Sequence, residues 1–118
     1  MKRTYDLDQA QKLIPLLDSI TVEVVERAQA IRDLSRELRR LRREDGPTEE
    51  ILNLQADLSI QRRSLRHCTE ELEALGCYVD EGHPLAVIIP GPDGTHESGY
   101  RWEAGSVEIA QLVSGFAS

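Results

Sequence analysis

The sequence predicts an α+β protein that is mainly helical, with a long antiparallel helical hairpin and a C-terminal β-hairpin packed at its base. Three observations lead to this prediction: two apolar seams with alternating spacings of three and four, a Gly-Pro turn between them, and a β-branched run nearer the C-terminus. The 118 residues allow one domain, 1–118. In it, residues 6–76 form the coiled-coil hairpin with a turn near 44–48, and residues 77–118 form the β-hairpin and a C-terminal segment.

The first helix is expected to begin at Asp6, because Asp6 followed by Gln9 fits a capping box. Its apolar residues then follow a heptad-like seam that is interrupted only at Arg27. Pro15 lies inside this run and removes one backbone hydrogen bond, so we expect a kink near residues 11–15. The seam consists of Ala10, Leu13, Leu17, Ile20, Val24, Ile31, Leu34, Leu38 and Leu41.

The second seam follows the Gly-Pro turn and ends at Gly76, a residue type that closes many helices. If the chain folds back at the turn, residues at equal sequence distance from Gly46 should face each other. The seams meet this condition in every layer, beginning with Leu41 opposite Ile51. An antiparallel hairpin satisfies both seams and the turn, and its long arm would measure about 50 Å. The second seam consists of Ile51, Leu54, Leu58, Gln61, Leu65, Cys68, Leu72 and Leu75.

Two polar residues, Arg27 and Gln61, interrupt the seams in adjacent layers. Such a pair can fix the register of a coiled coil when it is buried. The alternative, which we favour from the sequence, is that Arg27 extends past Ala28 to solvent while Gln61 points to water at the edge of the seam.

Beyond the second helix the pattern becomes that of strands. A β-branched run at residues 85–89 precedes a dense turn signal at residues 90–94, and residues 95–102 return as a second strand. Ser106 caps a further segment, residues 107–113, whose periodicity fits a helix and a strand equally. Because an isolated hairpin is marginal in water, we expect the first helix to cover it. The apolar residues that this helix offers away from its seam are Ile14, Leu16, Val22, Val25 and Ala28.

An apolar row on the second helix lies away from the seam, with Leu52, Ala56 and Ile60 at a spacing of four. On a two-helix arm such a row faces solvent unless a second copy covers it, so we expect a homo-oligomer with this row as its self-association ridge. The alternative is that scattered surface apolar residues need no partner. The predicted function is that of a non-enzymatic coiled-coil protein acting as a self-associating protein–protein interaction module.

The distribution of charge bears on a second hypothesis, contact with nucleic acid. Residues 32–66 carry nine basic and seven acidic side chains, whereas residues 67–118 carry one basic and nine acidic, within a net charge of −7. A general polyanion binder is therefore not expected. A basic hairpin tip could still lie against RNA or DNA phosphates through Arg36, Arg39, Arg40 and Arg43. Interleaved acidic residues and the absence of a tip aromatic place this alternative below self-association.

Catalytic and metal-binding signatures are absent from the sequence. The cysteine and histidine residues match no metal-ligand spacing, and Cys68 already occupies a seam position, so we expect no metal ion, no cofactor and no enzymatic activity. A weaker alternative is a small-molecule or metal site at the base of the hairpin. That site would involve Tyr100, Trp102 and His83.

The cellular compartment is inferred from three absences. The two cysteines cannot form a disulfide framework, and no apolar run approaches the roughly 20 residues that span a bilayer. The first residues also lack the apolar stretch of a secretion signal. We therefore expect a cytoplasmic protein that makes no use of a membrane.

Three stretches carry a resemblance to a known family. The opening motif at residues 5–15, the end of the second helix at residues 71–77 and several tail elements together resemble the bacterial domain-of-unknown-function family 2203. The opening motif contains Tyr5, Leu7, Asp8, Ala10, Leu13, Ile14 and Pro15, and the tail elements are Trp102 with Gly105, Glu108 with Ile109, and Gly115-Phe116-Ala117.

This resemblance implies a small cytoplasmic bacterial protein with a helical hairpin and a terminal β element, and it implies no reaction. Within it, Pro15 and Trp102 are structural landmarks rather than site residues. The sequence departs from the family pattern at Gln11, where members have asparagine. It also lacks the aromatic–histidine pair that members carry before the closing element.

Overall fold

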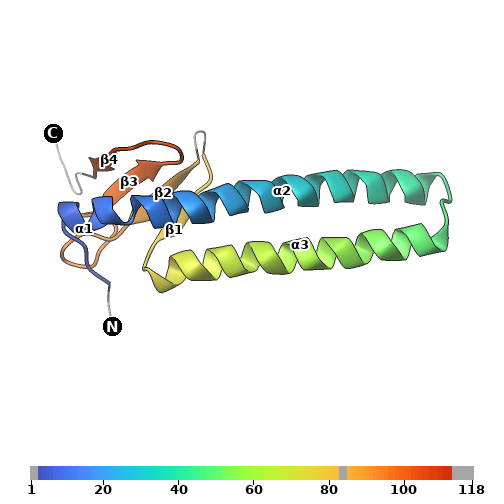
Figure 1. Ribbon diagram of the computed structural model, residues 1–118, viewed down its shortest axis with the longest axis horizontal. Helices are drawn as coiled ribbons and strands as arrows, with labels where there is room; N and C mark the ends of the chain where they lie inside the picture. The colour runs from blue at the N-terminus through green and yellow to red at the C-terminus, as the bar shows by residue number, and fades with distance from the viewer. Residues whose placement is uncertain (1–2, 83–84, 113–118) are drawn as a thin grey trace. The chain divides into compact units, whose positions relative to one another are not determined.

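The computed structural model describes residues 3–82 and 85–112 and shows a mainly helical α+β fold (Figure 1). Two long antiparallel helices run side by side, and a four-stranded antiparallel sheet is built from the C-terminal part of the chain. The predicted fold class is therefore confirmed. The elements of the described residues are α1 (Leu7–Lys12), α2 (Ile14–Arg43), α3 (Thr48–Ala74), β1 (Tyr78–Asp80), β2 (Ala86–Ile89), β3 (Tyr100–Glu103) and β4 (Ile109–Gln111).

The chain divides into two compact units that are described separately below. The sheet unit comprises Met1–Thr21 and Thr69–Ser118, and the hairpin unit comprises Val22–Cys68. The single domain expected from the sequence stays a prediction.

The start of the helical region follows the local sequence signals. The Gln9 amide donates to Asp6 Oδ1 at 2.7 Å and the Asp6 amide donates to Gln9 Oε1 at 2.9 Å, so the predicted capping box is present. Helix α1 then ends at Lys12 and α2 begins two residues later. Pro15 lacks an N–H group and its ring crowds the carbonyl four residues earlier, which explains the predicted break in the helix.

The turn of the hairpin unit lies between Arg43 and Thr48, as the Gly-Pro signal predicts. Asp45 has a positive φ of 50°, and the Gly46 amide donates to the Leu41 carbonyl at 2.7 Å. This bond, which spans five residues, satisfies the Leu41 carbonyl near the end of α2, and the left-handed conformation of Asp45 makes it possible. The helix ends also carry favourable charge, because α2 finishes with basic residues and α3 starts with acidic ones.

A substitution at this turn should raise stability. Asp45→Gly removes the steric cost of a left-handed conformation, so we expect the free energy of unfolding to rise by about 0.5–1 kcal/mol in urea denaturation. Gly46→Ala is the matched control and should lower the free energy of unfolding, because its Cβ would lie 2.7 Å from Leu41 Cδ2. A less stable Asp45→Gly protein would contradict this description of the turn.

The interior of the hairpin unit follows the predicted seams. Leu38, Leu41, Leu58 and Cys68 are buried in it. The polar layer differs from the favoured interpretation, because Gln61 does not simply point to water. Arg27 Nη1 donates to Gln61 Oε1 at 3.2 Å across the seam, and Arg27 Nε is buried without a hydrogen-bond partner among the described residues. The two interruptions therefore meet, as a register-fixing pair would.

The sheet unit contains more strands than the predicted hairpin. The strand order is β1-β2-β3-β4, and each neighbouring pair is antiparallel. The central strand β2 is fully buried, and β3 contributes the buried side chains of Tyr100 and Trp102. The segment left open between helix and strand contains β4 at Ile109–Gln111, and Val113 lies outside the described residues.

The end of α3 directs the chain into this sheet. Gly76 has a φ of 80°, its amide donates to the Glu73 carbonyl, and the Cys77 amide donates to the Leu72 carbonyl, both at 2.9 Å. This pair of bonds is a Schellman motif, so the predicted terminal glycine is confirmed. Strand β1 begins immediately afterwards, at Tyr78.

The helical residues expected to cover the strands are largely not those that are buried. Leu16, Val22 and Val25 are 44%, 52% and 51% exposed, so the expectation that they form the covering surface is wrong. In the sheet unit the buried helical residues include Leu17 and Thr21, whose hydroxyl donates to the Leu17 carbonyl at 2.8 Å. That internal bond satisfies the hydroxyl and allows a polar residue to be buried.

Candidate functional site

The predicted self-association ridge, Leu52, Ala56 and Ile60, lies exposed on α3 of the hairpin unit. The exposed fraction is 58% for Leu52 and 53% for Ile60, large values for branched apolar side chains. The spacing of four keeps the three residues on one face, and none of them belongs to the seam with α2. Helix α3 therefore presents an apolar row on its outer face.

A groove runs between α2 and α3 on one flank of the hairpin unit. Its volume is about 360 Å³, and its lining includes the buried side chains of Leu38 and Leu58. Three arginines line it, Arg39 and Arg42 from α2 and Arg62 from α3, and no acidic residue does. The remaining lining residues are Ser35, Gln55 and Ser59.

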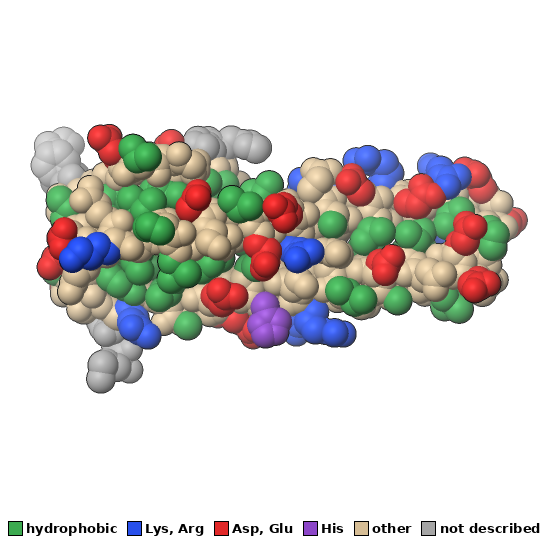
Figure 2. Space-filling model, viewed as in Figure 1, with side chains coloured by type: hydrophobic (Ala, Val, Ile, Leu, Met, Phe, Trp, Pro, Cys, Tyr) green, Lys and Arg blue, Asp and Glu red, His purple; other side chains and the backbone are tan. Residues whose placement is uncertain are grey.

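The other flank of the hairpin unit is acidic. Arg42 and Arg62 each follow a seam residue, whereas Glu37 and Asp57 each precede one, which places the two sets on opposite sides of the seam. Glu44 follows Glu37 by seven residues and so extends the acidic flank. On the face seen in Figure 2, acidic side chains are distributed along the hairpin, and basic ones lie along the outer edge of α2 and also beside the histidine on the edge of α3. The hairpin unit is thus basic on one flank, and on the other it carries acidic residues, of which Glu37 and Glu44 are paired with Arg40.

The four arginines predicted for nucleic-acid contact are not brought together in this groove. Arg36 lies 3.7 Å from Asp33 Oδ1, and Arg40 forms ion pairs with Glu37 and Glu44. The hydrogen bond from Arg40 lowers the pKa of the Glu37 carboxyl, so this pair stays charged at neutral pH. Arg39 lines the groove and Arg43 is exposed at the end of α2.

Two groove residues, Arg42 and Arg62, were missed by the sequence reasoning. A count of basic residues along the chain does not distinguish flanks. Their position relative to the seam carries the signal, because each stands one residue after a seam position of its own helix.

Two of the three residues of the weaker site hypothesis, Tyr100 and Trp102, make structural contacts inside the sheet unit. Tyr100 and Trp102 are buried, and His83 lies outside the described residues. Tyr100 donates its hydroxyl to the Tyr5 carbonyl at 3.1 Å, and Trp102 Nε1 donates to the Ser106 carbonyl at 2.8 Å. Burial also raises the pKa of Tyr100 above its usual value. These two side chains act as anchors of the sheet unit.

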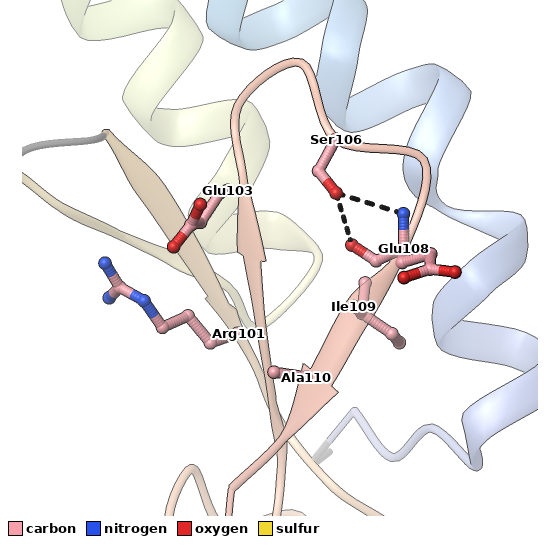
Figure 3. A pocket seen from close by; sticks show the side chains of 6 residues that line it. All are labelled: Arg101, Glu103, Ser106, Glu108, Ile109 and Ala110. Atoms are coloured by element: carbon pink, nitrogen blue, oxygen red, sulfur yellow. Dashed lines mark hydrogen bonds between the residues drawn. The ribbon is translucent and has the colours of Figure 1, made fainter.

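A shallow pocket of about 210 Å³ opens on β3 and β4 of the sheet unit (Figure 3). Arg101 lines it and is paired with Asp80, whose pKa is lowered by that hydrogen bond. Ser106 is held by Glu108, since its hydroxyl donates to the Glu108 carbonyl at 3.0 Å. The arrangement places no activated nucleophile next to a base, so it points to no reaction.

Both thiol groups, those of Cys68 and Cys77, are buried. Burial raises the pKa of Cys77 to about 12, so it is a neutral thiol at physiological pH. Cys68 is buried and its Sγ donates to Glu23 Oε2 at 2.9 Å. Within the described ranges there is no group of three or more potential ligands placed to hold a metal ion. No helix among the described residues is long and apolar enough to cross a membrane.

Comparison with known proteins supports the resemblance drawn from the opening motif and the tail. No curated protein and no solved structure matches the chain. The model of a family described as "Uncharacterized conserved protein (DUF2203)" matches residues 3–117, almost the whole sequence. The chain therefore belongs to the DUF2203 family.

Proposed function

We propose that the protein is a self-associating interaction module and that a second copy of the chain covers the outer face of α3. The observation that carries the proposal is the exposed row of Leu52, Ala56 and Ile60. A two-helix unit has no third layer to cover such a row. Packing it against the same row of another copy would remove apolar surface from water and complete a four-helix arrangement.

Charge favours a second copy as the occupant. The basic flank of the hairpin unit carries Arg42 and Arg62, and the acidic flank carries Glu37 and Asp57. If two hairpins pack through α3 while running in the same direction, two-fold symmetry brings each basic flank next to the acidic flank of its partner. The two rims of the apolar contact would then attract each other.

The test is the solution mass of Ile60→Arg. The new charge would be buried in the contact, so we expect the dissociation constant of the assembly to rise at least about tenfold, with an unchanged helical circular dichroism spectrum. Light scattering after gel filtration over a range of concentrations measures this change.

Val22→Arg is the matched control, since Val22 is 52% exposed but lies on α2, away from the ridge. It should leave the mass unchanged. An Ile60→Arg protein with the mass of the unmodified chain would overturn the ridge, and so would an equal loss of mass in both variants.

A further inference from the structure

We propose that the groove between α2 and α3 binds a short oligophosphate chain. Arg39, Arg42 and Arg62 line this groove of about 360 Å³ without any acidic neighbour in the lining. Gln55, Ser35 and Ser59 add an amide and two hydroxyl groups. Every polar side chain in the groove can therefore donate a hydrogen bond to an anion.

The three groove arginines have no charged partner among the described residues of the chain. Arg36 and Arg40 of the same unit are paired with carboxylates. In contrast, neither an ion pair nor a side-chain hydrogen bond joins Arg39, Arg42 or Arg62 to another described residue. Three like charges around one groove repel each other, and a bound anion would relieve that repulsion.

The apolar floor strengthens the site. Leu38 and Leu58 are 8% and 3% exposed and lie beneath the polar side chains of the groove. A charge held above buried apolar side chains is less well screened than one in open water, so each guanidinium–phosphate contact gains strength. Guanidinium groups also match two phosphate oxygens at once, which a lone ammonium group does not.

The lining determines the class of ligand. The volume falls in the usual range for small-molecule sites, and tripolyphosphate is of suitable size. The hairpin unit, Val22–Cys68, contains no Phe, Tyr or Trp on which a nucleobase could stack. Recognition would therefore rest on phosphate oxygens alone, whether the phosphates are inorganic or form the tail of a nucleotide.

The groove and the ridge are tested separately. The ridge lies on the outer face of α3, whereas the groove lies between α2 and α3 and is lined by no ridge residue. Arg42 and Arg62 belong both to the groove and to the basic flank proposed to meet the partner copy. Because Ile60→Arg changes no groove residue, an unchanged mass would overturn the ridge and leave the groove proposal standing. Absent tripolyphosphate binding would likewise leave the ridge standing.

The experiment is calorimetric titration of the full chain with inorganic tripolyphosphate at low salt. The groove variant is Arg39→Gln/Arg42→Gln/Arg62→Gln, and the control is Arg36→Gln/Arg43→Gln/Arg63→Gln, which removes the same charge outside the groove lining. We expect binding to weaken at least about tenfold in the groove variant and to change less than about threefold in the control. Glutamine is a good helix former, so both variants should keep their helical content.

Further arms identify the source of the phosphates and can overturn the proposal. A nucleoside triphosphate that binds as tightly as tripolyphosphate supports recognition of phosphates alone. Absent binding would overturn the site. Equal losses of affinity in both variants would also overturn it, because they would show a nonspecific electrostatic attraction to the basic side chains of the hairpin. A single-stranded oligonucleotide with the same number of phosphates that binds more tightly would assign the groove to nucleic acid instead. In the unmodified chain, the side-chain Nε–H signals of the three groove arginines should shift on titration, a readout that does not depend on how the variants fold.

Discussion

Trp102→Ala should lower the free energy of unfolding by about 3–5 kcal/mol, the usual cost of truncating a fully buried tryptophan. Trp102 is 0% exposed in the sheet unit, and its indole Nε1 donates to the Ser106 carbonyl at 2.8 Å. The substitution would therefore leave a cavity and also remove the donor that holds the turn after β3. Urea denaturation followed by circular dichroism measures the change in the midpoint.

Gly105→Ala separates the packing of Trp102 from the conformation of the adjacent turn. Gly105 has a φ of 88°, but apart from its chain neighbours no heavy atom lies within 4 Å of the position that an added Cβ would take. Only backbone strain should count against this variant, at about 1 kcal/mol. If Trp102→Ala proved no more damaging than Gly105→Ala, the tryptophan would not be the anchor described here.

These two residues, the Trp-x-x-Gly element of this chain, also have a physical role in the turn. The indole of Trp102 binds the backbone of the turn that Gly105 closes, and the Ser106 amide donates to the Glu103 carbonyl at 2.9 Å. The element therefore acts as a strand-and-turn device. This role agrees with the expectation that Trp102 is a structural landmark rather than a site residue.

The helical part of the fold could be predicted from the sequence because its signals are local. The capping box at Asp6, the break before Pro15, the turn after Arg43 and the terminal Gly76 each depend on a few neighbouring residues. The antiparallel pairing follows from one further fact, that both seams are equally distant from Gly46. Short-range rules of helix geometry were sufficient here.

The remaining features depend on contacts between distant residues, which periodicity does not reveal. Strand β1 has three residues and exists through its pairing with β2, for example Tyr78 with Ile88. The periodicity of the segment that contains β4 fits a helix and a strand equally. Its pairing with β3 decides for a strand, and that pairing cannot be seen in the sequence of the segment alone. The groove likewise requires both helices, since Arg42 and Arg62 line it from different helices.

For the polar layer of the seam, Arg27 and Gln61, we expect a single substitution to lower the free energy of unfolding and a double substitution to raise it. Gln61→Leu removes the acceptor of Arg27 Nη1 and should lower the free energy of unfolding by about 1–3 kcal/mol. The double variant Arg27→Leu/Gln61→Leu makes both seams continuously apolar, and we expect it to exceed the stability of the unmodified chain by about 1–4 kcal/mol. Urea denaturation of both variants, together with Arg27→Leu, gives the coupling energy as a double-mutant cycle.

Arg63→Leu is the control for removal of an arginine outside the seam, and its stability should stay within about 0.5 kcal/mol of that of the unmodified chain. A double variant less stable than the unmodified chain would show that the polar pair is a net source of stability. The expected result, a double variant more stable than the unmodified chain, would mean that Arg27 and Gln61 fix the register of the two helices rather than stabilise the fold. Arg27 Nε is buried without a partner among the described residues, a cost that an apolar layer would avoid. A polar layer that costs stability but aligns the helices would keep Arg39, Arg42 and Arg62 lining one groove, so the double variant should be more stable and bind tripolyphosphate less tightly.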